Sequence, residues 1–144
     1  MKTKLTALLT SVVLISTFTT TSLSASPQKK TQGKPFLIQG ELPHLTMMVK
    51  ILWEDEDLAL SAAQKKELLK IRKETMGGAK ALAKQINPLE AQIVKKSFSG
   101  AKPASLKADV TKLANLRAKA TMIHLECIYK TRGILSKDQL DILE

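Results

Sequence analysis

The sequence predicts an all-α fold, a long antiparallel helical hairpin with short flanking helices. Ala, Leu, Lys, Gln and Glu dominate the centre of the chain, and these residues are strong helix formers. Aromatic residues make up only 3% of the 144 positions, which disfavours a β-sandwich or a β-barrel. Apolar residues recur at steps of three and four, the spacing of one helix face. The length suits one domain of ordinary size.

Residues 1–25 have the features of a secretory signal peptide. Lys2 and Lys4 form a basic start, an apolar run follows, and small residues predict cleavage after Ala25, with Ser24 as the alternative. A transmembrane anchor is the competing interpretation, but the apolar run is shorter than the roughly 20 residues that a span needs. The absence of a cysteine near the cleavage site excludes a lipoprotein anchor. We therefore expect an exported protein, most simply in a bacterial periplasm.

The next segment, residues 26–42, is rich in Lys, Gln, Pro and Gly, which predicts a flexible arm. The folded domain is expected over 43–144, with a first helix from His44 to about Asp57. Four acidic residues at the end of that helix oppose its dipole, so this end is expected to fray or turn. The apolar positions of this helix are Leu45, Met48, Val49, Leu52 and Trp53.

A second, longer helix is expected after Ser61, which is a good N-cap and has Gln64 at capping-box spacing. Pro88 is expected to kink this helix because proline removes one backbone donor. The pair Gly77 and Gly78 predicts either a flexible point or the close approach of a neighbouring helix, and the surrounding alanines favour close approach. The predicted apolar stripe consists of Leu68, Ile71, Thr75, Gly78, Leu82, Ile86, Leu89 and Ile93.

A third helix is expected to start at a Ser105 cap and to end at Gly133. Ser136 then predicts the cap of a short final helix, with Gln139 again three residues later. Because a lone hairpin buries little apolar surface, we also expect a partner chain. The residues predicted for the core or for the interface of a dimer are Leu68, Ile71, Val110, Leu113, Leu116 and Ile123.

One pattern, Leu-Ser-x-x-Gln, occurs twice, and each copy opens a predicted helix. The first copy is Leu60, Ser61 and Gln64, and the second is Leu135, Ser136 and Gln139. The pattern resembles the Leu-Thr-x-x-Gln motif of the Spy/CpxP periplasmic family, with Ser in place of Thr, and both residue types cap helices. The resemblance covers roughly residues 44–144 and implies a cradle-shaped, all-helical homodimer. The motif residues have a structural role in this interpretation.

The resemblance implies one of two functions. Spy and CpxP are stress-induced proteins that bind unfolded or partner proteins without a nucleotide, through a basic and partly apolar concave surface. The related heavy-metal-resistance sensors, which are similar to CnrX, bind a transition metal through His, Met and carboxylate side chains near the first and third helices. The chain is therefore expected to be either a chaperone or stress regulator, or a metal sensor.

Four residues are candidate metal ligands. His44 and Met48 lie four residues apart on the first predicted helix, and His124 and Cys127 lie three apart on the third. Each pair combines an imidazole with a sulfur atom, a set that suits Cu, Ni, Co or Zn. The spacings differ from those of the sensors, and Met48 and Cys127 also fit a purely apolar role. Other candidate ligands are Met47, Met122, Glu74 and Glu126.

Charge favours the chaperone interpretation. The chain has a formal net charge of +10, and residues 58–137 hold 17 Lys and Arg against five Asp and Glu. Such a surface attracts acidic, partly unfolded clients or a membrane-bound sensor partner, although a merely solvated helix face is the simpler alternative. The sequence has no nucleic-acid recognition motif and carries an export signal, so no nucleic acid is expected. Weak contact with anionic membrane surfaces is a further alternative.

No enzymatic activity is expected. The sole cysteine, Cys127, is the obvious nucleophile, and His124 lies near it in sequence. Residues three apart on a helix project outward side by side, and no orienting third group or oxyanion donor accompanies them. The expectation is therefore a periplasmic stress protein that binds proteins without ATP, with a metal-sensing or metal-resistance role as the alternative.

Overall fold

The computed structural model of the protein describes residues 34–38, 40 and 42–143. The predicted signal peptide and the first part of the predicted arm lie outside these residues. Within them the chain forms four helices and no strand, which confirms the predicted all-α class. The helices are α1 (Leu45–Ile51), α2 (Ala62–Phe98), α3 (Pro103–Ile134) and α4 (Lys137–Leu143).

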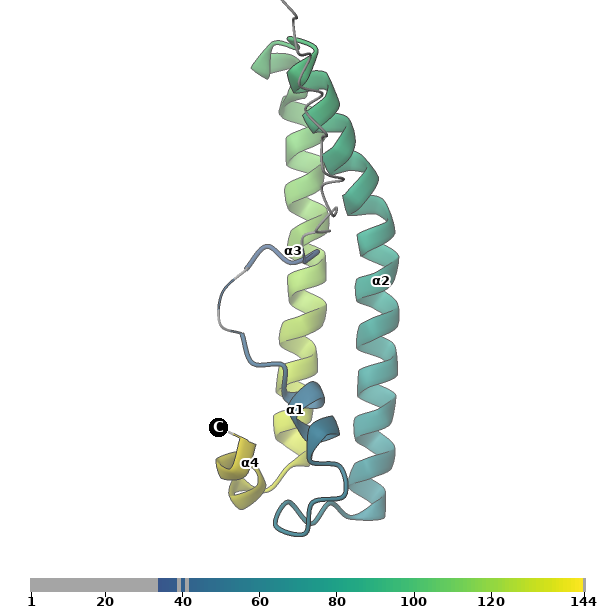
Figure 1. Ribbon diagram of the computed structural model, residues 1–144, viewed down its shortest axis with the longest axis vertical. Helices are drawn as coiled ribbons and strands as arrows, with labels where there is room; N and C mark the ends of the chain where they lie inside the picture. Colours follow the sequence, from purple (N-terminus) through teal and green to yellow (C-terminus); the bar gives the residue numbers. More distant parts are fainter. Residues whose placement is uncertain (1–33, 39, 41, 144) are drawn as a thin grey trace, which may run out of the picture. The chain divides into compact units, whose positions relative to one another are not determined.

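Helices α2 and α3 run antiparallel side by side and form the predicted hairpin (Figure 1). α2 begins where the sequence predicts, because Ser61 and Gln64 form a complete capping box. The Gln64 N–H donates to Ser61 Oγ over 3.2 Å, and the Ser61 N–H donates to Gln64 Oε1 over 3.0 Å. The helix then continues through Pro88 as one element.

The turn between α2 and α3 is closed by a Schellman motif. The Gly100 N–H donates to the Ser97 carbonyl, and the Ala101 N–H donates to the Lys96 carbonyl. Gly100 has a φ of +79°, a left-handed conformation that residues with a Cβ rarely adopt. This turn reverses the chain so that α3 returns along α2.

Both predicted limits of the third helix are corrected by the structure. Lys102, not Ser105, is the N-cap of α3, because Pro103 occupies the first helical position, where no N–H is needed. Ser105 lies inside the first turn, and its hydroxyl donates to the Lys102 carbonyl over 2.7 Å. At the other end, Gly133 lies within the last turn, and α3 ends at Ile134.

Close approach of the two long helices occurs at one of the two adjacent glycines. A Cβ placed on Gly78 would lie 3.0 Å from Cδ1 of Ile123 on α3, whereas a Cβ on Gly77 would meet open space. The expectation of a close helix neighbour is therefore confirmed at Gly78 and wrong at Gly77. The two residues differ because successive positions on a helix point about 100° apart.

Two apolar clusters hold the fold together. The first joins α1, α2 and α4 at the base of the hairpin, and the second lies between α2 and α3. Leu68, Ile71 and Leu116 are buried as predicted, but Val110 is 49% exposed and does not belong to the core of this chain. The base cluster consists of Val49, Leu58, Leu68, Leu135 and Leu143, and the upper cluster of Ile86, Leu116 and Ala120.

The first helix is shorter than predicted and stops at Ile51 rather than near Asp57. Beyond it, Asp55 Oδ1 accepts hydrogen bonds from the N–H groups of Asp57 and Leu58, each over 3.0 Å. Such aspartate-centred turns compete with helix continuation, so the acidic run turns the chain toward α2. Among residues 34–38, 40 and 42–143, none of the helices has the length and apolar character that would let it cross a bilayer.

Candidate functional site

The two Leu-Ser-x-x-Gln motifs meet at the base of the hairpin. The second copy forms the same box as the first: the Gln139 N–H donates to Ser136 Oγ over 3.2 Å, and the Ser136 N–H donates to Gln139 Oε1 over 3.0 Å. Leu135 is buried in the base cluster, and Leu60 packs against that cluster. All six motif residues thus lie around one junction of the chain.

The glutamine side chains join the two boxes directly. Gln64 Nε2 donates to Gln139 Oε1 over 2.8 Å and to the Ile134 carbonyl over 3.0 Å. In return, Gln139 Nε2 donates to the Leu58 carbonyl over 2.8 Å. Each glutamine therefore caps its own helix and satisfies a backbone carbonyl before the other motif, which ties the start of α2 to the end of α3.

A stack of three rings lies against the C-terminal half of α3. The His124 ring packs between Phe36, at a centroid distance of 5.0 Å, and His44, at 4.6 Å. The three side chains come from the segment before α1, from the N-cap of α1 and from α3. The stack therefore holds the N-terminal segment and the start of α1 against the long hairpin.

Burial changes the protonation of His124, which is only 5% exposed. Desolvation by burial, followed by the nearby His44 imidazole, lowers the pKa of His124 below its ordinary value of 6.5, and the charge of Lys34 acts in the same direction. A hydrogen bond with the Pro43 backbone opposes this shift. His124 is accordingly neutral in the fold at neutral pH.

The structure brings three of the four candidate metal ligands together. His44, His124 and Cys127 line one pocket of about 270 Å³, together with the sulfur-containing residues Met47 and Met76. Met48 instead packs against the base cluster. Cys127 is buried, and its Sγ lies 3.8 Å from Thr46 Oγ1. The structure therefore places Met47, not Met48, beside the two histidines in this pocket.

The arrangement of these side chains does not form a ready metal site. The planes of His44 and His124 lie only 18° apart, so the in-plane lone pairs of stacked rings run nearly parallel instead of converging on one point. Among the residues that the structure describes, no group of three or more His, Cys, Asp and Glu is placed to hold a metal ion. Glu74, Met122 and Glu126 line a different pocket of about 420 Å³, which Cys127 also lines.

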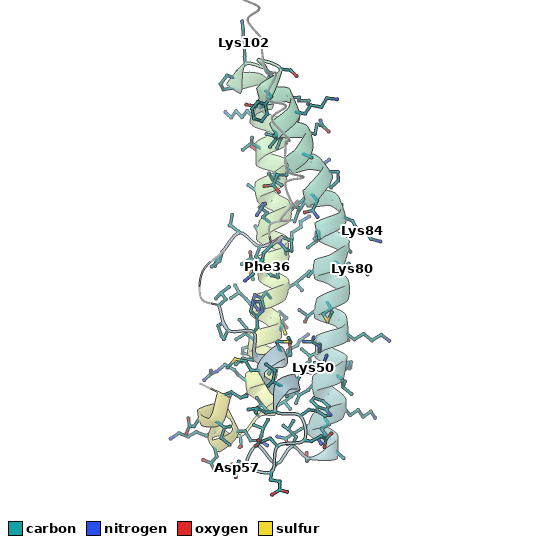
Figure 2. All side chains as sticks on the ribbon, in the orientation of Figure 1. Phe36, Lys50, Asp57, Lys80, Lys84 and Lys102 are labelled. Carbon is teal, nitrogen blue, oxygen red and sulfur yellow. The ribbon has the colours of Figure 1, made fainter. Side chains whose placement is uncertain are left out.

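Part of the predicted arm is fixed to the hairpin. The Leu37 N–H donates to Thr121 Oγ1 over 2.7 Å, and Arg117 donates to the carbonyls of Lys34 and Phe36 over 3.2 and 3.3 Å. Phe36 also packs against the upper cluster and lies beside α3 in Figure 2. Sequence reasoning missed Phe36 as a site residue; the signal was the short apolar run of Phe36, Leu37 and Ile38 in a segment otherwise rich in Lys, Gln, Pro and Gly.

A basic surface covers both long helices. Lys80 and Lys84 project from α2 away from α3, and Lys102 projects from the turn (Figure 2). On α3, Lys107, Lys112 and Lys119 line a groove of about 900 Å³ together with uncharged residues only. Large apolar side chains are exposed on the same two helices, namely Leu69, Met76, Val94, Phe98, Val110, Met122 and Tyr129.

Comparison with known proteins adds no family assignment: no family model matches the chain, and no curated protein or solved structure shows a significant match. The resemblance to the Spy/CpxP family therefore depends on the two motifs and on their setting in the chain.

Proposed function

We propose that this chain is a periplasmic, Spy/CpxP-like stress protein that binds unfolded or partner proteins without ATP. The observation that carries the proposal is the surface of α2 and α3, where lysines and exposed apolar side chains occur together on one helical hairpin. The junction of the two Leu-Ser-x-x-Gln motifs at the base of that hairpin supports the same assignment. The burial of Cys127 favours a binding role over an enzymatic one.

The physical basis of binding is long-range attraction followed by weak apolar contact. Lysine side chains attract acidic clients over a distance set by the salt concentration, about 10 Å at 0.1 M. Residues such as Phe98, which is 90% exposed, and Met76, which is 56% exposed, then cover apolar segments of the client. Because each contact is small, the client is held without a nucleotide and is released without one.

The same surface defines the partners in this proposal. A second copy of the chain covers part of the exposed apolar surface of the hairpin, Val110 included, and the homodimer forms the cradle. Acidic protein clients or a membrane-bound sensor bind the basic face, and anionic membrane surfaces contact it weakly. Nucleic acid is not among the proposed partners.

Suppression of aggregation tests this proposal. The purified protein is mixed with a chemically unfolded acidic protein in the absence of ATP, and light scattering is followed after dilution of the denaturant. We expect less scattering in the presence of the protein and a weaker effect as NaCl rises from about 50 mM to about 500 mM. Unchanged scattering would refute the proposal, and suppression that is independent of salt would leave apolar contact as its main cause.

A metal-sensing or metal-resistance role is the second candidate. The observation that favours it is the shared pocket of His44, His124, Cys127 and Met47. The imidazole and sulfur groups would hold a soft or borderline ion such as Cu, Ni, Co or Zn, but only after at least one ring leaves the stack. Metal binding in this proposal therefore changes the contact between α3 and the start of α1.

Calorimetric titration with each of the four metals under reducing conditions tests the second candidate. The double variant His44→Ala/His124→Ala is titrated alongside the unchanged protein. Stoichiometric binding at about micromolar affinity or tighter that is lost in the double variant supports a metal-linked role. Binding that both proteins share, or no binding at all, removes the metal candidate and leaves the protein-binding function.

A further inference from the structure

A separate pocket lies between α1 and the first half of α2. It has a volume of about 420 Å³, within the range of small-molecule sites. Trp53, Leu68 and Leu69 supply its apolar wall, and Lys50, Arg72 and Thr46 supply its polar groups. Lys50 is labelled in Figure 2 at the face of α1 that is turned toward α2. The pocket is distinct from the histidine pocket, although Arg72 lines both.

Two positive charges border this apolar wall without a carboxylate. Within the described part of the chain, neither Lys50 nor Arg72 forms an ion pair. Arg72 is half-buried, and the contact of its Nη2 is the neutral Met47 Sδ, 3.9 Å away. By contrast, Lys65, which lies over the Trp53 ring, is paired with Glu54. A half-buried guanidinium with only a sulfur neighbour lacks the charged acceptor that it binds most strongly.

We propose that this pocket binds a small amphipathic carboxylate, a molecule with an alkyl chain that ends in a carboxylate group. The carboxylate accepts hydrogen bonds from the Arg72 guanidinium and pairs with Lys50. The alkyl chain lies against Trp53, Leu68 and Leu69. This ligand supplies what the pocket lacks, a negative charge at one end and apolar surface along the rest.

The polar groups of the pocket favour such a ligand over a protein segment. A peptide backbone brings an N–H and a C=O group with every residue, and each of these needs a partner when it is buried. The remaining polar side chain of the pocket, Thr46, is already in contact with Cys127 Sγ. An alkyl chain has no polar groups and therefore needs no hydrogen-bond partners in the pocket. A neutral or cationic amphiphile would leave both positive charges without a partner.

Trp53 makes the proposal directly measurable because it is the only tryptophan of the chain. The purified protein is titrated with sodium decanoate below the concentration at which decanoate forms micelles, and tryptophan fluorescence is recorded. We expect a saturable change with one decanoate bound per chain. Decanol, which has the same chain and no charge, is expected to bind about tenfold more weakly or worse.

Matched variants test whether the change in tryptophan fluorescence depends on the positive charges of Arg72 and Lys50. Arg72→Gln is expected to raise the Kd for decanoate by about tenfold or more, whereas Lys73→Gln, the exposed neighbour on α2 outside the pocket, is expected to change it by less than about twofold. If Arg72→Gln does not fold, as judged by circular dichroism, Lys50→Gln replaces it, and a rise of about threefold or more is expected because Lys50 is exposed.

Three results would overturn the proposal. The first is the absence of a saturable change, and the second is an equal Kd for decanoate in the Arg72 and Lys73 variants, or for decanoate and decanol. The third is a fluorescence response to a short acidic, leucine-containing peptide but not to decanoate, which would assign the pocket to protein clients. None of these results depends on aggregation suppression, so the pocket and the protein-binding function fail or succeed separately.

Discussion

The side chains of Gln64 and Gln139, 75 residues apart in the sequence, are joined by a hydrogen bond of 2.8 Å from Nε2 to Oε1. Each glutamine also accepts a hydrogen bond from the N–H of the serine that caps its helix. The junction thus links two local capping motifs into one long-range contact. It fixes the ends of α2 and α3 at the base, while the rest of the hairpin carries the charged and apolar surface.

Loss of the Gln139 side chain is predicted to destabilise the fold. Gln139→Ala removes a cap and leaves the Leu58 carbonyl without its donor, which costs about 1–3 kcal/mol of the free energy of unfolding. The control is Gln92→Ala, at an exposed position within α2. Denaturant titration followed by circular dichroism measures both variants, and equal stability of the two would contradict the structural role of the junction.

The two adjacent glycines are predicted to respond differently to alanine. Gly77→Ala should stabilise the protein by about 1 kcal/mol, because a helical glycine is replaced at an open position. Gly78→Ala should give a smaller gain in stability or a loss of stability, because the new Cβ would lie 3.0 Å from Ile123 Cδ1. Both substitutions are repeated in an Ile123→Val background, which lacks Cδ1, and thermal unfolding is measured. The difference in stability between the two alanine variants should then be smaller. A difference of the same size would rule out the contact with Ile123 as its cause.

The free energy of unfolding is predicted to decrease as the pH is lowered, because His124 titrates. Burial, followed by the neighbouring His44 imidazole and the charge of Lys34, lowers the pKa of His124 in the folded state below 6.5, so the unfolded chain binds a proton more readily. The contribution of the neutral His124 side chain to stability is therefore present above pH 6.5. It is lost as the pH falls from that value toward the lowered pKa. His124→Phe keeps an aromatic ring in the stack and removes the titration.

Thermal unfolding at about pH 8 and about pH 5.5 checks this prediction. The unchanged protein should lose more stability between the two values than His124→Phe does. An equal loss in both proteins would show that other groups, chiefly carboxylates, cause the pH dependence.

Two aspartate substitutions are predicted to separate the core from the proposed dimer interface. Leu113 is half-buried against the upper cluster, so Leu113→Asp should cost at least about 2 kcal/mol and abolish the folded dimer. Val110 is 49% exposed, so Val110→Asp should keep its helicity and lose the dimer. Circular dichroism and analytical ultracentrifugation measure the two effects. A dimeric, fully helical Leu113→Asp protein would contradict the core assignment, and a dimeric Val110→Asp protein would remove Val110 from the interface.

Local features of the fold were predictable because they depend on neighbouring residues. The capping boxes of Ser61 and Ser136 follow from a spacing of three, and the long apolar stripes follow from helical periodicity. The start of α3 was misplaced because two residues that favour a helix start, Pro103 and Ser105, lie close together, and the helix begins at Pro103. The end of α1 was misplaced because the aspartate turn at Asp55 looks like a charged helix end in the sequence.

The candidate sites were less predictable because they join distant parts of the chain. A spacing of four places His44 and Met48 on one face only if both lie within the helix, but His44 is the N-cap of α1, and Met47 rather than Met48 lines the histidine pocket. Phe36 was hidden because its contacts with α3 lie more than 80 residues away and its neighbours suggest an arm. The pocket of Trp53 and Arg72 likewise requires α1 and α2 to be placed together.

The proposed function requires that the protein bind an unfolded client, and fluorescence anisotropy measures this binding. One acidic client is labelled and titrated with this protein at low salt, without ATP, once in its folded state and once in a permanently unfolded variant. We expect saturable binding of the unfolded form, a Kd that rises by about tenfold or more between about 50 mM and about 500 mM NaCl, and little binding of the folded form. Equal binding of both forms, or binding of neither, would contradict it.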